Sequence, residues 1–293
     1  MSRKAAQTGP DAMVLVAMEQ HLPERERIVT DDLAYPILPL GSRVQVRLFG
    51  PFTKWVIKQS EHKVPGLWGG ILARKAYIDD VVSESLDGRI EAVVNLGTGF
   101  DTRPYRLQAL SDAAVWEVDL PQNIDAKRPR LEKLFEQVPE HVTLVSIDFD
   151  HQDLATVLGS HGYEADTQTF YIWEGVTQYV TEDGVRATFD FLARAPSGSR
   201  LVFTYIPRDF IDGEVLYGQE YLYKQMLVKD KIWVFGLDPE QVDGFIGEYG
   251  WRVLEHLGYD ELDRRFVKPT GRDLQSMAIE RIVLAEKTSQ ARG

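Results

Sequence analysis

The chain has 293 residues, of which 44% are hydrophobic, and it contains no cysteine. This composition is typical of a soluble globular protein, and it excludes disulfides and thiolate metal sites. The formal charge of −12 disfavours nucleic-acid binding, because phosphate recognition depends on lysine and arginine.

No apolar run approaches the roughly 20 residues of a membrane span, and the first ten residues are polar. We therefore expect a cytoplasmic protein without a membrane partner. The six histidines include no pair at i, i+4 spacing, so no metal site is predicted. The only compact basic cluster recognised is that of Lys127, Arg128 and Arg130, which we interpret as the solvated face of a helix.

The first 88 residues have helical patterning. Within them Arg74 shares one helical stripe with Ile71, Ile78 and Val81. Its guanidinium is therefore expected inside the protein, where it needs an anionic partner. The residues leave two partners open, a carboxylate of the protein and a carboxylate of a bound ligand.

A short strand near 91–96 runs into the turn Gly97-Thr98-Gly99. Glycine lacks a Cβ, so such a turn can direct backbone N–H groups at a bound nucleoside. A dinucleotide fingerprint would have a third glycine at position 102, where this chain has threonine. The turn predicts a nucleotide-like cofactor, and the alternative is a turn that binds nothing.

A second strand, near 114–118, is followed by Asp119. Doubly wound folds place a ribose-binding carboxylate about 20 residues past the glycines, which makes Asp119 the first candidate. Glu117 points to the same side of the strand and is the second. Pro121 then opens a helix that covers the sheet.

Further strands are predicted near 142–147, 168–173 and 199–205, followed by a closing pair near 251–256 and 279–286. Strands that alternate with helices indicate a parallel sheet. Asp148 and Glu174 follow the third and fourth strands; each could bind a ligand, and equally Asp148 could cap a helix and Glu174 could close a strand end.

We predict a single domain, residues 1–293, with four parts: a helical region at 1–88, a core at 89–206, a cap at 207–247 and closing strands at 248–293. The stretch 209–237 is too aromatic for a solvent loop. It could roof a substrate pocket, and it could equally be the core of the helical cap.

Three ordered motifs, at 96–107, 117–121 and 174–181, resemble the leucine carboxyl methyltransferase family, whose bacterial branch includes polyketide carboxyl methyltransferases of the tetracenomycin type. The resemblance implies a Rossmann-like class I fold, with a seven-stranded, mostly parallel α/β sheet. It also implies an S-adenosylmethionine (SAM) dependent O-methyltransferase of small molecules, as in secondary metabolism.

The resemblance assigns roles to single residues. Gly97 would contact SAM through its backbone, Asp119 would bind the ribose, and Arg74 would hold the methionine carboxylate. Glu174 would lie near the amino group. The complete cofactor-binding set predicted is Arg74, Gly97, Thr98, Gly99, Asp119, Leu120, Asp148, Phe149 and Glu174, with Asp148 and Phe149 beside the adenine.

Four residues at or beyond strand ends are the acceptor candidates: Gln178, Tyr179, Tyr205 and Arg208. Arg208 is the natural partner of an anionic acceptor. Gln178 departs from the family, which usually has an apolar residue there. We predict no catalytic side chain, because a carboxylate acceptor is already ionised at neutral pH.

The sequence leaves other acceptors open: a phenol, a phosphonate or a peptide carboxylate. Two other classes also remain, an NAD-dependent oxidoreductase and a SAM-binding protein without catalysis. The oligomeric state is left open as well.

Overall fold

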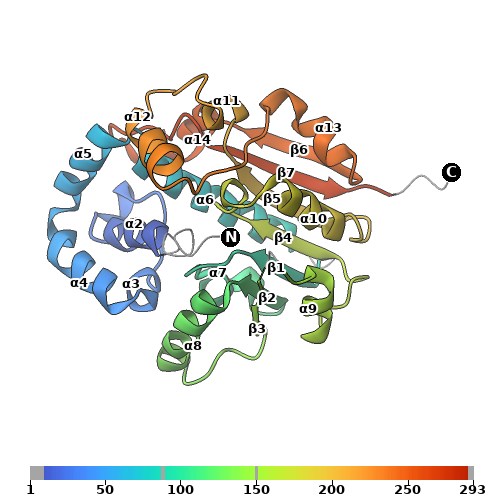
Figure 1. Cartoon of the computed structure of the whole chain (residues 1–293). Helices are drawn as coiled ribbons and strands as arrows, with labels where there is room; N and C mark the ends of the chain where they lie inside the picture. The colour runs from blue at the N-terminus through green and yellow to red at the C-terminus, as the bar shows by residue number, and fades with distance from the viewer. Residues whose placement is uncertain (1–9, 87–89, 149–150, 290–293) are drawn as a thin grey trace.

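The computed structural model describes residues 10–86, 90–148 and 151–289. Its centre is one seven-stranded sheet with the order β3-β2-β1-β4-β5-β7-β6 (Figure 1). The strands are β1 (Ala92–Leu96), β2 (Ala114–Asp119), β3 (Val142–Ser146), β4 (Thr169–Trp173), β5 (Arg200–Tyr205), β6 (Trp251–Leu257) and β7 (Arg281–Lys287). The predicted α/β fold class, with a mostly parallel sheet, is confirmed.

The closing strands distinguish this sheet from a dinucleotide-binding one. Strands β1 to β5 pair in parallel, whereas β7 inserts antiparallel between β5 and β6. The dinucleotide fold continues instead with a sixth parallel strand, in the order 3-2-1-4-5-6. The topology therefore argues against the NAD-dependent alternative.

Helices cover both faces of the sheet, because successive strand residues point to opposite sides. Val93 packs in the core on the side of α6 (Leu67–Ser85) and α8 (Pro121–Phe135). Val94 packs in the core on the other side. That side is covered by α9 (Leu154–Ser160), α10 (Glu182–Leu192) and α13 (Val242–Gly247).

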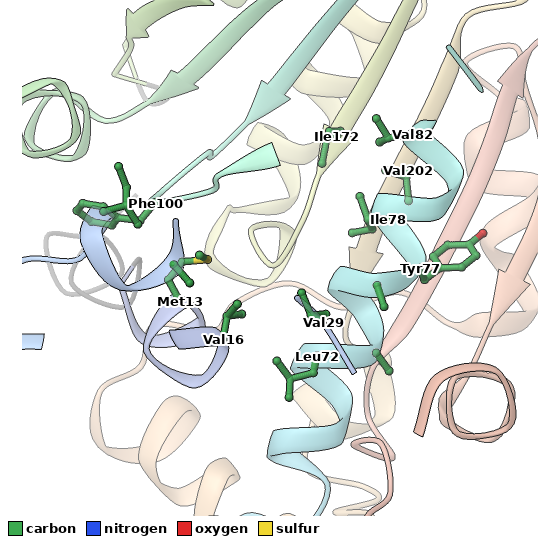
Figure 2. Close-up of a cluster of buried hydrophobic side chains, with 14 of the residues drawn as sticks. Met13, Val16, Val29, Leu72, Tyr77, Ile78, Val82, Phe100, Ile172 and Val202 are labelled. Carbon is green, nitrogen blue, oxygen red and sulfur yellow. The ribbon is translucent and has the colours of Figure 1, made fainter. Parts of the chain in front are cut away.

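Helix α6 is the helix that carries Arg74. Figure 2 shows Ile78 and Val82 on this helix facing Ile172 of β4 and Val202 of β5. Ile78, Val82 and Val202 are fully buried, and each such side chain stabilises the fold by roughly 1.5–3 kcal/mol. The helix is therefore fixed on the sheet, and Arg74 lies one turn nearer its start.

The described residues before β1 form helices, as predicted: α2 (Asp11–Glu19), α3 (Ala34–Ile37), α4 (Leu40–Phe49), α5 (Thr53–Lys63) and α6. Figure 2 shows Met13 of α2 close to Phe100, which follows the glycine turn. The N-terminal helices thus lie beside the end of the sheet at which the cofactor is predicted. In the part of the chain that the structure describes, no helix has the length and apolarity needed to cross a membrane.

The segment predicted as a cap has two structural roles. Its first part contains α11 (Arg208–Ile211), α12 (Glu220–Tyr223) and the π-helical turn η5 (Lys224–Lys229). Phe210, Leu222 and Trp233 form a small core there with Val64 and Met277. Its last part, α13, packs on the sheet, so the predicted range 207–247 extends one helix too far.

Candidate functional site

A cavity of about 620 Å³ opens at the carboxyl ends of β1, β2 and β4. Helices α2, α5 and α6 and the segment from α12 to Trp233 enclose it. Its polar lining near the sheet is Arg74, Lys75, Asn95, Thr98, Asp101, Asp119, Asn123, Glu174, Gln178, Tyr179 and Glu280, together with Gly97 and Gly99. A cavity of this size is in the range that holds cofactors.

The glycine turn has the expected shape but not the expected hydrogen bonds. Gly97 and Gly99 have φ of 73° and 51°. The Gly97 and Thr98 N–H groups donate to the Val118 carbonyl at 2.8 and 3.2 Å, and the Gly99 N–H donates to Asp119 Oδ2 at 2.6 Å. These N–H groups are thus engaged within the protein and not free for a ligand: those of Gly97 and Thr98 continue the ladder between β1 and β2, and that of Gly99 is bonded to the Asp119 side chain. Glycine is required at 97 because a Cβ there would collide with Val176.

Asp119 ends β2 and lies in the cavity wall. Its Oδ1 accepts hydrogen bonds from the Leu120 N–H at 2.6 Å and the Asn123 amide at 2.8 Å. Burial raises the pKa of Asp119, although these hydrogen bonds and Lys127 oppose the shift. A buried carboxylate held in this way at a strand's carboxyl end is placed to accept from a diol.

Glu117, the second ribose candidate, lies elsewhere. Its carboxylate is fully buried against Lys127, at 2.7 Å, and it accepts from the Tyr105 hydroxyl at 2.5 Å. The pair supports the glycine turn from below, since Thr98 Oγ1 also donates to Glu117 at 2.8 Å. The interpretation of Lys127 as part of a solvated face is therefore wrong.

Position 102 separates this turn from a dinucleotide fingerprint. Thr102 is buried, and its hydroxyl donates to Asp31 Oδ2 at 2.5 Å. Its side chain and the loop of Asp31 occupy space that a third glycine would leave open. The structure thus gives a physical basis for the missing glycine.

Three cations converge on Glu174. Its carboxylate lies 2.8 Å from Arg74 Nε, 3.3 Å from Lys75 Nζ and 2.7 Å from Arg103 Nη1. Burial alone would raise the pKa of Glu174, but Lys75, Arg103 and Arg74 outweigh it and hold that pKa well below its usual range. Glu174 is therefore a permanent anion in the wall of the cavity.

Arg74 has an internal partner as well as access to the cavity. Its Nη1 lies 2.5 Å from Glu280 Oε1, in addition to the contact with Glu174. Of the two partners that the sequence left open, the protein carboxylates are present, and the guanidinium also lines the cavity. A ligand carboxylate would have to share Arg74 with these acids.

Three members of this cluster that contact Arg74 or Glu174 were not identified from the sequence: Lys75, Arg103 and Glu280. Arg103 is completely buried and contacts Asp79 at 2.6 Å and Asp101 at 2.8 Å as well as Glu174. Arg103 belongs to the motif at 96–107, and its place in that motif could have identified it as a site residue. Glu280 precedes β7; because β7 is antiparallel, the residue before it lies at the same sheet edge as the residues after β1, β2 and β4.

The predicted adenine side is only partly described. Asp148 is half-buried and does not line the cavity, and Phe149 lies outside the described residues. The helix cap next to them is Asp153, which accepts from the Thr156 N–H, and not Asp148. The side chain of Leu120 is buried outside the lining.

The four acceptor candidates separate into two pairs. Gln178 and Tyr179 line the cavity, whereas Tyr205 and Arg208 do not. The Tyr205 hydroxyl bonds to His256 Nε2 at 2.9 Å, within the core. The guanidinium of Arg208 stacks over Phe235 at 5.7 Å. These two predictions are corrected.

The end of β5 explains that correction. Pro207 forms a bridge with Leu237, and the Leu237 N–H donates to the Ile206 carbonyl at 3.1 Å. The returning chain therefore covers the carboxyl end of β5, and side chains there are separated from the cavity.

Trp233 lies beside Gln178 and Tyr179, the two acceptor candidates that line the cavity. The Val234 N–H donates to the Gln178 carbonyl at 2.8 Å, and the rings of Tyr179 and Trp233 meet edge to face with centroids 6.2 Å apart. Gln178 Oε1 and Trp233 Nε1 are both buried without a hydrogen-bond partner in the described structure. Buried polar atoms of this kind are rare in native proteins and point to a missing partner.

The rest of the lining is mostly apolar, and its polar members are Asp11, Gln45, Ser60, Tyr221 and Gln225. Its apolar members include Met13, Leu15, Val56, Leu67, Ile71, Phe100, Leu222, Met226 and Met277. These side chains come from α2, α5, α6 and the segment around α12. The cavity thus has a charged end at the sheet and an apolar end under the helices.

The sequence signature of the leucine carboxyl methyltransferase family matches residues 11–193, well over half of the chain. The chain belongs to the leucine carboxyl methyltransferase family. The family match contains the glycine turn, Asp119, the charged cluster around Glu174 and Gln178. It ends before the cap, so Trp233 and Glu280 lie outside it.

Individual relatives are similarly distant. A Mycobacterium avium protein named "Putative S-adenosyl-L-methionine-dependent methyltransferase" is 29% identical over 196 residues, which cover 66% of this chain and 64% of that protein, less than two thirds of its length. The protein YktD of Bacillus subtilis, similarly named, is 26% identical over 73% of this chain and 69% of its own.

A solved structure shows the same fold at low identity. The crystal structure described as a "putative methyltransferase" from Thermobifida fusca superposes with a TM-score of 0.57 and 14% identity. The similarity covers 84% of this chain and 94% of that one. The fold of this leucine carboxyl methyltransferase family member is therefore shared over most of its length.

Proposed function

We propose that this protein is a SAM-dependent methyltransferase that methylates a carboxylate of a small molecule with an apolar body. The observation that carries the proposal is a single cavity in which Asp119 and the cluster of Arg74, Lys75 and Glu174 face a largely apolar remainder. The family membership and the names of the relatives support SAM-dependent methyl transfer, the coarser part of this proposal.

The charged end suits the polar groups of SAM. Asp119 offers a carboxylate to the ribose hydroxyls, at the place where doubly wound folds bind a ribose. The amino-acid part of SAM carries one cation and one anion, and this cluster offers both signs: Arg74 and Lys75 for the carboxylate, Glu174 and Glu280 for the ammonium group. Bidentate guanidinium contacts suit carboxylates in particular.

The apolar end suits an acceptor held without a strong counterion. Gln178 and Trp233 could supply neutral hydrogen-bond donors, because the two ends of a glutamine amide can exchange by a flip. A neutral donor leaves more charge on the attacking oxygen than an arginine would. The position of Arg208 outside the cavity is therefore compatible with a carboxylate acceptor.

Bound SAM would supply an electrophilic methyl group on its sulfonium. The acceptor oxygen forms the new bond to the methyl carbon, the C–S bond breaks with its electron pair going to sulfur, and a methyl ester and S-adenosylhomocysteine result without any proton transfer. The protein then contributes alignment and exclusion of water. The apolar walls around Met13, Leu222 and Met226 provide that dry environment.

The test is to incubate the protein with SAM and a set of amphiphilic carboxylic acids and phenols, and to identify the methylated product by mass spectrometry. A product that releases methanol in mild alkali is an ester. Transfer to a carboxylate should be nearly flat from about pH 6 to 9, because no base has to lose a proton. Alkali-stable ethers, formed at a rate that rises with pH, would show that a phenol is the acceptor and contradict the carboxylate proposal.

A further inference from the structure

The outer surface of α4 and α5 carries an unusual series of exposed apolar side chains. Leu40, Val44 and Leu48 follow one another at i, i+4 and i+8 and are 67%, 49% and 61% exposed. Phe52 and Trp55 continue the series toward α5, at 62% and 58%. Figure 1 shows both helices on the outer rim of the molecule, away from the sheet. We call this surface the α4–α5 face; exposed apolar surfaces of this kind mark interaction sites.

The same face is basic in a protein whose net charge is −12. Its single acid, Glu61, is engaged with two backbone N–H groups. Lys54 pairs with Glu26 at 2.8 Å, and within the described ranges the other four cations form no ion pair. The five cations between residues 40 and 63 are Arg43, Arg47, Lys54, Lys58 and Lys63. All of them are exposed except Arg43, which is half-buried.

The cavity opens beside this face. Gln45 of α4 is exposed and also lines the cavity, and Val56 and Ser60 of α5 line it as well. An acceptor that enters here would pass directly from the α4–α5 face to the apolar end of the cavity.

We propose that the α4–α5 face docks on an anionic lipid surface. Leucine, phenylalanine and tryptophan next to lysine and arginine are the combination by which amphipathic helices lie in a membrane interface. Cations near an anionic leaflet are attracted to it. A second copy of the chain fits less well, because a symmetric contact would bring one set of four exposed cations against the other.

Docking on lipid also indicates which kind of acceptor the protein uses, and this step rests on the proposed function. When the α4–α5 face lies on lipid, the opening of the cavity beside Gln45 lies at the lipid–water interface. The acceptor would then be an amphiphilic acid taken from that surface. The sequence-based expectation of no membrane partner depended on the lack of a spanning segment and on the polar first ten residues, and neither of these tests an interfacial contact.

The experiment is co-sedimentation with vesicles of phosphatidylcholine, with and without phosphatidylglycerol. We expect binding only to the anionic vesicles, with a strong decrease at high salt. The double variants Arg47→Glu with Lys58→Glu, and Phe52→Ser with Trp55→Ser, should each lower vesicle partitioning by roughly tenfold or more. The control is Lys133→Glu with Arg194→Glu, exposed residues on α8 and after α10, which should bind as the wild type does.

Binding of S-adenosylhomocysteine by each variant checks folding and separates this proposal from the proposed function. Lost vesicle binding with unchanged S-adenosylhomocysteine affinity supports docking, whatever the reaction proves to be. Equal vesicle binding by all variants would overturn it. So would a lipid-free dimer in analytical ultracentrifugation that the Phe52→Ser and Trp55→Ser variant converts to monomers, since the occupant would then be a second copy.

Discussion

The two ends of the cavity differ in how their buried polar groups are satisfied. At the sheet end, Arg74, Arg103 and Glu174 all have partners of opposite charge within 3 Å. At the helix end, Gln178 and Trp233 each keep a polar atom that has no hydrogen-bond partner among the described residues. An unpaired buried polar atom costs roughly 1–3 kcal/mol, so it persists where a ligand can supply the missing bond. The cofactor end is thus complete in the protein alone, and the acceptor end is not.

Of the substitutions considered, removal of the Arg103 side chain should destabilise the sheet end of the cavity most. Its side chain has no exposure and contacts three carboxylates, so Arg103→Ala leaves buried anions uncompensated. We expect the free energy of unfolding in urea to fall by about 3–5 kcal/mol. Arg264→Ala, at an exposed pair with Glu261, should cost less than about 1 kcal/mol. Equal losses in the two variants would refute the view that this cluster holds the cofactor end together.

Two acids on β2 are expected to differ in ligand binding, because only Asp119 lines the cavity. Asp119→Ala should weaken S-adenosylhomocysteine binding by roughly 1–3 kcal/mol, because Asp119 lines the cavity and would lose its charged hydrogen bonds to ribose. Glu117→Gln, which disturbs the pair with Lys127, should lower stability and leave that affinity nearly unchanged. Calorimetry and urea unfolding of both variants decide the matter; the reverse pattern would move the ribose contact to Glu117.

Substitutions of Gln178 and Trp233 test whether the helix end of the cavity binds the acceptor. Gln178→Leu and Trp233→Phe keep most of the side-chain volume and remove the unpartnered polar atom. Each should raise the KM of the acceptor by about tenfold, or about 1.4 kcal/mol, while the KM of SAM is unchanged. A higher KM for SAM with a normal KM for the acceptor would place these residues at the cofactor instead.

The smallest expected effect is a pH dependence of cofactor binding. Because burial raises the pKa of Asp119, this carboxylate takes up a proton at a higher pH than the usual value of about 3.9. S-adenosylhomocysteine affinity should therefore fall on acidification before free aspartate would titrate, and Asp119→Asn should abolish the fall. Glu174, whose pKa is held low, does not titrate there. An identical fall in Asp119→Asn would assign it to another group.

The sequence predicts the sheet end well because its residues follow strands. Each of Gly97, Asp119 and Glu174 comes at or directly after a strand end, and parallel strands bring such residues to one edge. The same rule fails for Arg208, since the chain at Leu237 folds back over the end of β5. It also misses Glu280, which precedes its strand.

The sequence could not predict which polar groups would form hydrogen bonds within the protein and so be less available to a ligand. The N–H of Gly99 and the carboxylate of Asp119 pair with one another, so removal of Asp119 should also cost stability, which the sequence alone does not suggest. The basic character of the α4–α5 face was likewise hidden in a net charge of −12. Contacts between distant segments, such as Gln178 with the residues around Trp233, have no local pattern.

The most direct test of the account is isothermal titration calorimetry with S-adenosylhomocysteine and, separately, with NAD. A cavity that pairs Asp119 with the cluster around Glu174, and that carries Thr102 in place of a third glycine, predicts micromolar-range binding of S-adenosylhomocysteine and no binding of NAD. Binding of NAD without binding of S-adenosylhomocysteine would contradict it.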